Sequence, residues 1–400
     1  MENLLAHLRK GSSALPTFNT TSSPLQIHLA KTFAGKKVFV TGHTGFKGSW
    51  LCEWLLLLGA NVTGFSLPGS VSSPNLFDQL GLSSRLKDIR GDIRDARAIR
   101  DALVGCAPDF VFHLAAQPLV RISYRDPAET WQTNVLGTVN VLEALRTLQN
   151  QMPERASSET SPLMARAQPV VAVMVTTDKC YENREWVHGY REEDARGGHD
   201  PYSSSKAACE IAISSWRRSF FTDQRVEIAS ARAGNVIGGG DWAADRIVPD
   251  CIRALQKGQQ IPVRNKNSTR PWQHVLEPLS GYLLLASQLS SISNLQTSAS
   301  SAAAFNFGPD LASNRTVEQL VQEVLKHFPG KWVDRTNPRA PHEAGKLNLA
   351  TDKAFHLLGW RPRWRFPTTI EKTVSWYRTS ASGRDASELT RRQIQEYSEQ

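Results

Sequence analysis

The sequence predicts an α/β protein with a Rossmann-type, doubly wound parallel sheet and a smaller C-terminal substrate-binding lobe. Three observations carry this prediction. Apolar strand-like runs alternate with helical stretches through the first half of the chain, a glycine-rich turn follows the first of those runs, and the alternation ends after Asn235. Alternating strands and helices are typical of a parallel sheet covered by helices. The chain has 400 residues, enough for such a domain and a second lobe.

The first repeat is a strand, a turn, a helix and a second strand. Residues 36–41 (KKVFVT) are predicted to form a buried strand, and 42–48 (GHTGFKG) the turn after it. Residues 49–58 have helical length and an apolar stripe that ends at Gly59, and 61–65 (NVTGF) follow as a strand. This order is the repeating unit of a parallel α/β sheet.

Later segments continue the alternation. Further strands are expected at 109–114, 170–175 and 226–230, and helices at 126–148 and 202–221. The run VVAVMV at 170–175 is apolar throughout, which is typical of a central parallel strand buried on both faces.

These elements divide the chain into four parts, interrupted by two low-complexity stretches that we expect to be surface insertions. Because residues 1–33 are rich in Ser and Thr with Glu2 as their only acid, organelle targeting is the alternative to a disordered extension there. The parts are a flexible N-terminal extension over 1–33, a dinucleotide-binding domain over 34–236 with an insertion at about 150–168, a second lobe over 237–378 with a return strand near 305–308 and an insertion at about 287–303, and a polar tail over 379–400.

Composition argues against several classes of protein. The formal charge of +9 comes without basic clusters interleaved with aromatic residues, so we expect no nucleic-acid partner; the excess suits a solvated surface or an anionic pyrophosphate substrate. The five cysteines show no C-x-x-C spacing, which argues against a disulfide framework or a metal site and favours a reducing, cytoplasmic compartment. No apolar run approaches the ~20 residues that cross a bilayer, so no membrane contact is expected.

The turn after the first strand has the spacing G-x-x-G-x-x-G, formed by Gly42, Gly45 and Gly48. A pyrophosphate can approach the backbone closely where side chains are missing, and the N-terminus of the following helix offers free N–H groups. The turn therefore predicts a bound dinucleotide, and a turn used only for tight packing is the alternative.

The end of the second strand leaves the choice of dinucleotide open. Residues 65–68 (FSLP) contain no acid for the ribose hydroxyls of NAD and no Arg for the 2′-phosphate of NADP. Asp92 and Ile93 are candidates for holding the adenine end.

Tyr202 and Lys206 lie four residues apart at the start of a predicted helix and so share one face. An ammonium beside a phenol favours the phenolate and lowers a pKa that is about 10 in isolation. The pair is therefore a candidate proton-transfer device, with an ordinary surface helix as the alternative.

Thr177, Asp178 and Lys179 directly follow the strand at 170–175, where open α/β sheets bind ligands. Thr177 offers a hydrogen bond to a sugar hydroxyl. Simple hydride transfer needs neither an acid nor a base here, whereas eliminating water from a sugar needs both. The triplet thus indicates an elimination, with a strand-end turn and surface ion pair as the alternative.

Taken together, these motifs resemble those of the CDP-glucose 4,6-dehydratases, a group of the extended short-chain dehydrogenase/reductase (nucleotide-sugar epimerase/dehydratase) family. The resemblance runs from about Lys36 to about Trp376, and the GGGDW and PHEA sequences narrow it to this group. The matching segments are TGHTGFKGSW (41–50), HLAAQPLVR (113–121), TDKCYEN (177–183), YSSSK (202–206), RAGNVIGGGDWAADR (232–246), RPWQHV (270–275) and PHEAG (341–345).

The resemblance implies a mechanism for CDP-glucose. Tyr202 takes the C4 hydroxyl proton while hydride moves to NAD, Lys179 removes the C5 proton, and Asp178 protonates the leaving C6 hydroxyl. Hydride then returns to C6 to give CDP-4-keto-6-deoxyglucose for deoxysugar biosynthesis. An ammonium must lose its proton before it acts as a base, so an alternative role for Lys179 is to position Asp178.

The resemblance also implies binding residues and a homodimer joined through the helices around 130–148 and 202–221. His113 is instead expected to be a packed strand residue. The implied cofactor residues are Gly42, Thr44, Gly45, Phe46, Lys47, Gly48, Asp92, Ile93, Leu114, Ala115, Ala116, Tyr202, Lys206 and Ala233; Asn235, Arg246 and Arg270 face the nucleotide and its pyrophosphate, and Gln117, Arg121 and Tyr124 face the sugar.

Two rival functions remain. One is the same scaffold acting as an epimerase or 4,6-dehydratase on another nucleotide sugar, dTDP-glucose or GDP-mannose; Asp178 and Lys179 argue against an epimerase, which has no leaving hydroxyl to protonate. The other is a non-catalytic NAD-binding protein, against which the intact Tyr202 and Lys206 argue.

Overall fold

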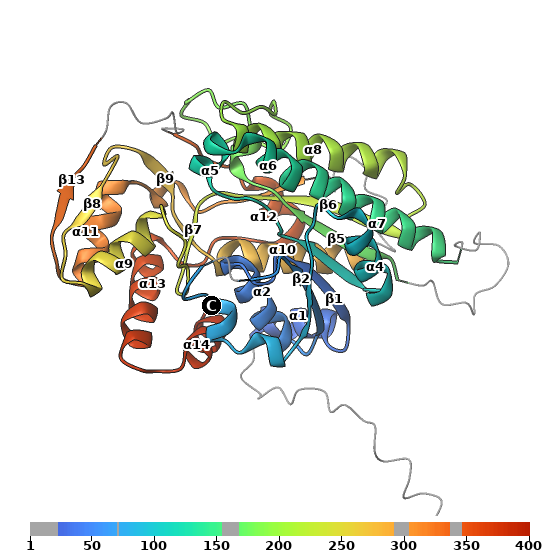
Figure 1. Cartoon of the computed structure of the whole chain (residues 1–400), viewed down its shortest axis with the longest axis horizontal. Coiled ribbons are helices and arrows are strands. Elements are labelled where there is room, and N and C mark those ends of the chain that lie inside the picture. Colours follow the sequence, from blue (N-terminus) through green and yellow to red (C-terminus); the bar gives the residue numbers. More distant parts are fainter. Residues whose placement is uncertain (1–22, 70–71, 154–167, 292–303, 337–345) are drawn as a thin grey trace, which may run out of the picture.

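The computed structural model describes residues 23–69, 72–153, 168–291, 304–336 and 346–400. Its main sheet has seven parallel strands in the order β11-β6-β5-β4-β1-β2-β3 (Figure 1). The strands are β1 (Lys37–Thr41), β2 (Asn61–Ser66), β3 (Lys87–Arg90), β4 (Phe110–His113), β5 (Val170–Val175), β6 (Val226–Ala233) and β11 (Ala304–Phe307).

The strand order reverses at β1, because the chain adds β2 and β3 on one side and then β4 on the other. Ligands of open α/β sheets bind at such a reversal, outside the carboxyl ends of the strands. The carboxyl ends of β1, β4 and β5 are therefore the place to look for a site.

Helices cover both faces of the sheet because alternate strand residues point to opposite sides. Val38 and Val40 share a core with α1 (Pro24–Phe33), α2 (Phe46–Leu57) and α10 (Leu276–Ser290). Phe39 belongs to a second core with α4 (Ala96–Cys106), α7 (Gly137–Gln151) and α8 (Pro201–Ser219), which lie on the opposite side of the sheet (Figure 1).

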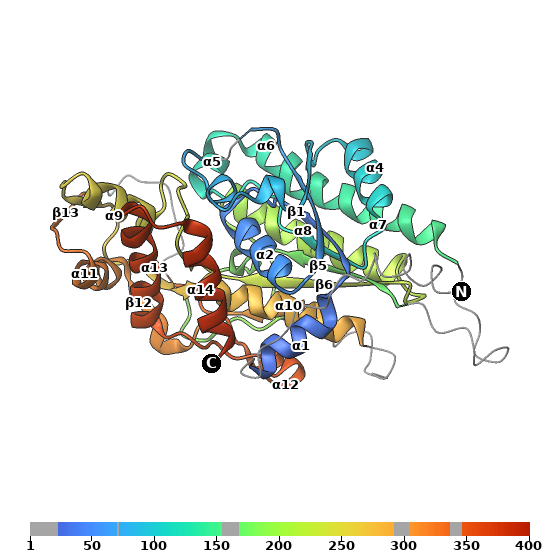
Figure 2. The same ribbon diagram turned by 90° about the horizontal axis from the view of Figure 1, so that it is seen from below.

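The second lobe contains short strands and helices that lie to one side of the main domain (Figure 2). Its strands form three two-stranded sheets: β7 (Val236–Ile237) with β10 (Gln273–His274), β8 (Ile261–Val263) with β13 (Trp332–Asp334), and β9 (Thr269–Pro271) with β12 (Asn314–Thr316). The other α-helices of the described residues, in either lobe, are α3 (Leu76–Gln79), α5 (Val120–Arg125), α6 (Pro127–Trp131), α9 (Ile247–Gln256), α11 (Val317–His327), α12 (Asp352–Leu358), α13 (Phe366–Ala381) and α14 (Ala386–Ser398).

Most predicted elements are confirmed, with shifted ends. β5 has the predicted bounds, and the predicted return strand is β11, which pairs with β6. α2 begins three residues earlier than expected because Gly45 is its N-cap. The helix expected over 126–148 is divided by a π-helix, Gln132–Leu136. β3 and α4 were not predicted.

Two terminal helices contradict part of the expected flexible extension, over residues 24–33, and the expected loose polar tail. Residues 24–33 form α1, which buries Leu29 and Phe33 against the sheet. Residues 386–398 form α14, which lies between α13 and the main domain and buries Leu389, Ile394 and Tyr397 (Figure 2). Each helix hides one apolar stripe in an otherwise polar sequence.

The expected insertions are only partly described. Residues 287–290 belong to the buried end of α10 and not to a surface insertion. Residues 1–22, 154–167 and 292–303 lie outside the described residues, as does the PHEAG segment at 341–345.

Candidate functional site

The glycine turn packs against the end of β4. Gly42 has φ +73°, and a Cβ there would lie 2.8 Å from the backbone nitrogen of Ala115. A Cβ at Gly48 would lie 2.2 Å from the carbonyl oxygen of Gly42. Tight packing therefore requires these two glycines. The N-terminus of α2 carries no side-chain cap, so its N–H groups also suit an anion.

A buried histidine closes the end of β2 beside this turn. His43 Nδ1 lies 3.0 Å from Ser66 Oγ, and His43 Nε2 lies 2.9 Å from Asp88 Oδ1. Arg90 also contacts Asp88, at 2.8 Å. Asp88 and Arg90 were missed because β3 was not predicted. They place an acidic and a basic side chain close to the end of β2, where residues 65–68 contain neither.

His113 is buried, as expected for a packed strand residue. Its ring joins Thr41 Oγ1 at 2.7 Å to Thr138 Oγ1 at 3.2 Å. Burial lowers its pKa to about 3, with Lys206 nearby acting in the same direction, so the ring is neutral. Thr41 Oγ1 in turn accepts the N–H groups of Leu114 and Ala115.

The triplet after β5 forms a compact cluster. The Thr177 hydroxyl donates to Asp178 Oδ1 at 2.9 Å, and Lys179 Nζ lies 3.6 Å from the same oxygen. Lys179 Nζ also donates to Asn235 Oδ1 at 3.1 Å. Asp178 is 1% exposed, and a Cβ at Gly234 would lie 2.8 Å from its Oδ2. This is a buried acid with an ammonium beside it, and not a surface ion pair.

Tyr202 joins this cluster from the first turn of α8. Burial raises the pKa of the Tyr202 phenol, its hydrogen bond with Thr177 opposes that effect, Asp178 adds to it, and Arg246 opposes it. The expectation of a lowered pKa is therefore wrong for the chain alone. Lys206 is itself buried, which lowers its pKa.

Lys47 lies near the same cluster and was expected only to line the cofactor. Its Nζ donates to Tyr282 Oη at 3.3 Å. Burial, followed by the charges of Arg246 and Lys206, lowers the pKa of Lys47 to about 7. Two buried amines with lowered pKa values, Lys47 and Lys206, thus lie near the predicted reaction centre.

The other predicted residues occupy varied surroundings. Arg246 binds Asp241 at 3.0 Å. Arg270 is buried and donates to the carbonyl of Thr269 at 2.9 Å. Ile93 and Ala233 are buried, and Asp92 binds Arg94 at 2.6 Å. Phe46 begins α2, Thr44 lies in the turn before it, and Ala116 lies in the loop after β4.

The three sugar-side candidates are less closely associated with the cluster. The Gln117 amide donates to Thr130 Oγ1 at 2.9 Å and to the Leu119 carbonyl at 3.1 Å, which shapes its own loop. Tyr124 is 38% exposed. Arg121 lies 3.8 Å from Asp245 of the second lobe.

A buried ion pair beneath the cluster was also missed. Arg232 Nη2 lies 2.6 Å from Glu210 Oε2, and both side chains are almost fully buried. Glu210 also accepts hydrogen bonds from Ser230 Oγ at 2.8 Å and from the Thr176 hydroxyl. Two features of the sequence could have indicated this ion pair. Glu210 lies four residues after Lys206, and Arg232 lies inside an apolar strand.

Two searches of the described residues concern metals and membranes. Within these parts of the chain, no group of three or more His, Cys, Asp or Glu side chains has the arrangement of a metal site. Among the helices described, none combines the length and apolar character of a bilayer-spanning segment.

The reversed parallel sheet, the glycine turn and the Tyr202–Lys206 pair define the class: this is the epimerase/dehydratase fold of the short-chain dehydrogenases/reductases. Solved structures agree. A dTDP-glucose 4,6-dehydratase of Streptomyces venezuelae with NAD bound has a TM-score of 0.71 at 21% identity, covering 87% of this chain and 98% of its own. A Thermotoga maritima UDP-glucose 4-epimerase has a TM-score of 0.67 at 21% identity, covering 86% and 99%.

Sequence comparison narrows the class. The GDP-mannose 4,6-dehydratase family matches residues 39–373. CDP-glucose 4,6-dehydratase of Salmonella typhimurium is 43% identical over 91% of this chain and 96% of its own, and dTDP-glucose 4,6-dehydratase of Streptomyces antibioticus is 28% identical over 85% and 92%. The chain belongs to the GDP-mannose 4,6-dehydratase family.

Proposed function

We propose that this enzyme dehydrates CDP-glucose to CDP-4-keto-6-deoxyglucose for deoxysugar biosynthesis. The observation that carries the proposal is the buried Thr177–Asp178–Lys179 cluster beside Tyr202, found in a chain 43% identical to a CDP-glucose 4,6-dehydratase. The named dTDP-glucose dehydratases are 28% identical or less, which supports CDP-glucose over dTDP-glucose.

The site fits NAD as the resident cofactor. The turn at Gly42 and Gly48 leaves no room for a Cβ, and the first N–H groups of α2 are uncapped. The residues proposed to hold it are Gly42, Thr44, Gly45, Phe46, Lys47, Gly48, Asp92, Ile93, Leu114, Ala115, Ala116, Lys206 and Ala233. When bound, NAD would accept hydride from C4 and return it to C6.

The chain's own residues would move the protons. Tyr202, as the phenolate, would take the C4 hydroxyl proton, and the positive charge of Arg246 favours that phenolate. Asp178, held by the Thr177 hydroxyl, would protonate the C6 hydroxyl as it leaves. Lys179 would either take the C5 proton as the neutral amine or, with its Nζ 3.6 Å from Asp178 Oδ1, orient that acid.

Substitution of the phenol tests this assignment. Tyr202→Phe keeps the ring but removes the proton acceptor, so we expect kcat to fall by about 10²- to 10⁴-fold. The thermal unfolding temperature should change little. Wild-type activity in the variant would contradict the role of Tyr202.

A substrate panel tests the function. Purified enzyme is incubated with CDP-glucose, dTDP-glucose or GDP-mannose, with NAD added to a parallel tube, and products are weighed by mass spectrometry. Loss of one water from CDP-glucose without net NADH supports the proposal. Turnover of another sugar alone would correct the substrate, an unchanged mass with inverted C4 would indicate an epimerase, and a folded, NAD-bound but inactive protein would favour a binding function.

We further propose a cytoplasmic homodimer. Apolar side chains stand exposed on neighbouring helices: Trp131 on α6 is 42% exposed, Leu136 is 54% and Ile211 on α8 is 62%. Exposed apolar side chains on neighbouring helices support an interface there. The five free thiols support a reducing, cytoplasmic compartment. Ile211→Asp should shift the mass measured by light scattering from dimer to monomer; an unchanged mass would contradict this interface.

A further inference from the structure

The segment before α9, residues 241–246, ends in Arg246 and connects the second lobe to the reaction centre. It has no helix or strand of its own. Arg246 lies close enough to Tyr202 and Lys47 to influence both electrostatically. Its guanidinium is held by Asp241 at 3.0 Å. The position of Arg246 therefore depends on what fixes this segment.

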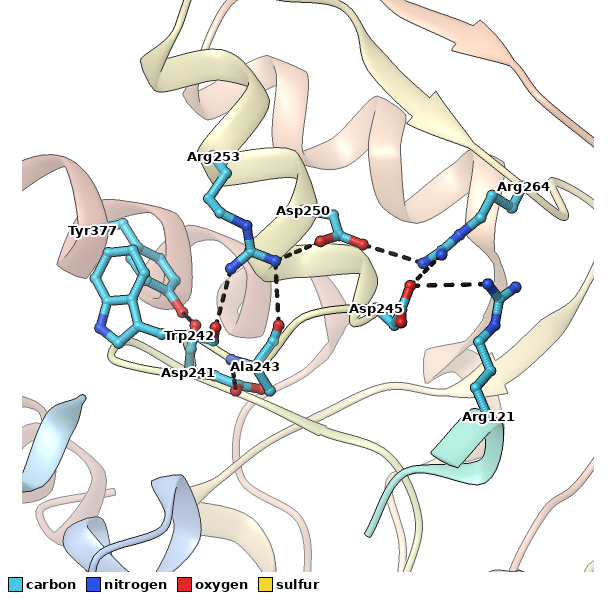
Figure 3. A network of polar contacts seen from close by, with 9 residues as sticks. All are labelled: Arg121, Asp241, Trp242, Ala243, Asp245, Asp250, Arg253, Arg264 and Tyr377. Atoms are coloured by element: carbon cyan, nitrogen blue, oxygen red, sulfur yellow. Dashed lines mark hydrogen bonds and ion pairs between the residues drawn. The ribbon is translucent and has the colours of Figure 1, made fainter. Parts of the chain in front are cut away.

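Side chains from outside fix the first half of the segment (Figure 3). The Tyr377 hydroxyl donates to the carbonyl of Asp241 at 2.5 Å. Arg253 donates to the carbonyls of Trp242 and Ala243, at 3.1 and 3.2 Å. These contacts come from α13 and α9, so they tie the segment to the second lobe.

Asp245 fixes the second half. Its backbone has φ +64°, a left-handed conformation that an Asp adopts more readily than most residues but still at some cost. Its carboxylate lies between two guanidinium groups, Arg264 of the second lobe and Arg121 of α5 (Figure 3). Arg264 also reaches Asp250 at 3.2 Å.

The Arg121 contact crosses from the second lobe to the main domain. Arg121 belongs to α5, and two residues later Ser123 Oγ accepts the backbone N–H of Tyr202 at 3.1 Å. α5 thus contacts the start of α8 through Ser123 and contacts Asp245 through Arg121. A continuous chain of contacts connects Tyr202 with the segment that carries Arg246.

We propose that Asp245 is a positioning residue that, with Arg121 and Arg264, forms a clasp between the two lobes. The clasp holds residues 241–246 over the start of α8, so that Arg246 is in place for the diphosphate of the substrate. This role of Arg246 rests on the proposed function, whereas the clasp itself rests on the contacts above. Arg121 thereby acts through Asp245 and not by touching the sugar.

Asp245→Asn tests the clasp, because Asn keeps the shape of the side chain and tolerates the same backbone while removing the charge. Arg121→Gln removes the other partner. Both positions are partly exposed, at 47% and 40% of the side chain, so unfolding temperatures should stay close to wild type. Each variant should raise KM for CDP-glucose about three- to tenfold and change kcat less than about twofold.

The double variant separates the clasp from two independent effects. If both residues act through one contact, the double variant should raise KM no more than the larger single change. Multiplied effects, or an unchanged KM in Asp245→Asn, would overturn the proposal. The matched control is Arg97→Gln on α4, where Arg97 forms an ion pair with Asp101 of the same helix and is 85% exposed.

Hydrogen exchange gives a readout that needs no substrate. Amides of residues 241–247 should exchange faster in Asp245→Asn than in wild type, and no faster in Arg97→Gln. Unchanged exchange would overturn the clasp even in an active enzyme. If the wild type does not act on CDP-glucose, the proposed function fails and the exchange result alone decides the clasp.

Discussion

Two buried glutamates have pKa values shifted in opposite directions. Glu210 lies beneath the reaction centre and Glu277 beneath the C-terminal helix α14. Burial raises the pKa of Glu210, but the charge and hydrogen bonds of Arg232, with hydrogen bonds from Thr176 and Ser230, outweigh it, so the pKa is lowered. Burial raises the pKa of Glu277 to about 7, although N–H groups of Trp364 and Arg363 and the hydroxyl of Tyr397 oppose it.

The difference shows what a full ionic partner contributes. Glu210 faces a guanidinium at 2.6 Å and is stable as a carboxylate. Glu277 accepts hydrogen bonds from the Trp364 backbone N–H at 2.6 Å and from Tyr397 at 2.7 Å, which satisfy its oxygens without placing a cation against them. β6 is therefore held to α8 by a charge pair, whereas α14 is held by an acid with a raised pKa.

Removing the charge of Glu210 should have the largest effect. Glu210→Ala leaves Arg232 buried without its anion, which should cost about 3–5 kcal/mol in the free energy of unfolding. Urea denaturation at neutral pH measures the loss. The double variant Glu210→Ala/Arg232→Met should recover much of it; a double variant as unstable as the single would contradict the ion pair as the cause.

The pH dependence of stability should separate the two sites next. The raised pKa of Glu277 means that the unfolded chain, with a pKa of about 4.3, loses this proton before the folded chain does. Stability from this group is therefore highest below about pH 4.3 and falls until about pH 7, by on the order of 3 kcal/mol. Glu210, with a lowered pKa, stabilises above its unfolded pKa and loses that contribution as the pH falls below it.

Glu277→Gln should remove the Glu277 part of this profile. As the pH rises from 5 to 8, the free energy of unfolding of the variant should increase relative to that of wild type. Any constant difference introduced by the amide does not affect this trend. Thermal unfolding across that range measures the change. A difference between variant and wild type that does not vary with pH would contradict the raised pKa.

The smallest effect is expected at the contact between α14 and α2. Arg391 binds the buried Glu53 at 2.6 Å, but it is 44% exposed and Arg85 also binds Glu53. Arg391→Gln should therefore cost no more than about 1 kcal/mol, and less at high salt. A loss as large as that of Glu210→Ala would show that α14 depends on this pair far more than its exposure suggests.

A comparison of β5 with α14 shows how far the sequence could predict the fold. β5 and the turn after β1 were predictable because apolar runs and glycine spacing act over a few residues. α14 was missed because its buried positions, such as Leu389, Gln393 and Tyr397, form a helical stripe diluted by polar residues. Its partners Glu53 and Glu277 lie more than a hundred residues away in the sequence, so no local pattern revealed that the helix is docked.

The candidate site divides in the same way. Thr177, Asp178 and Lys179 were predictable because they follow the end of a recognisable strand, and Tyr202 because it lies at a recognisable helix start. Asp88 and Arg90 could not be placed without β3, and the contact of Arg121 with Asp245 depends on how two lobes meet. A lowered pKa for Tyr202 was wrong because spacing shows a neighbouring Lys but not the burial of the phenol.

The fate of the C4 hydrogen tests the central claim most directly. CDP-glucose carrying deuterium at C4 is incubated with the enzyme in ordinary water, and the product is examined by NMR and mass spectrometry. Internal hydride transfer with loss of water predicts a product one water lighter, with deuterium at C6. Deuterium that remains at C4, or is lost to solvent, would contradict the proposed dehydration.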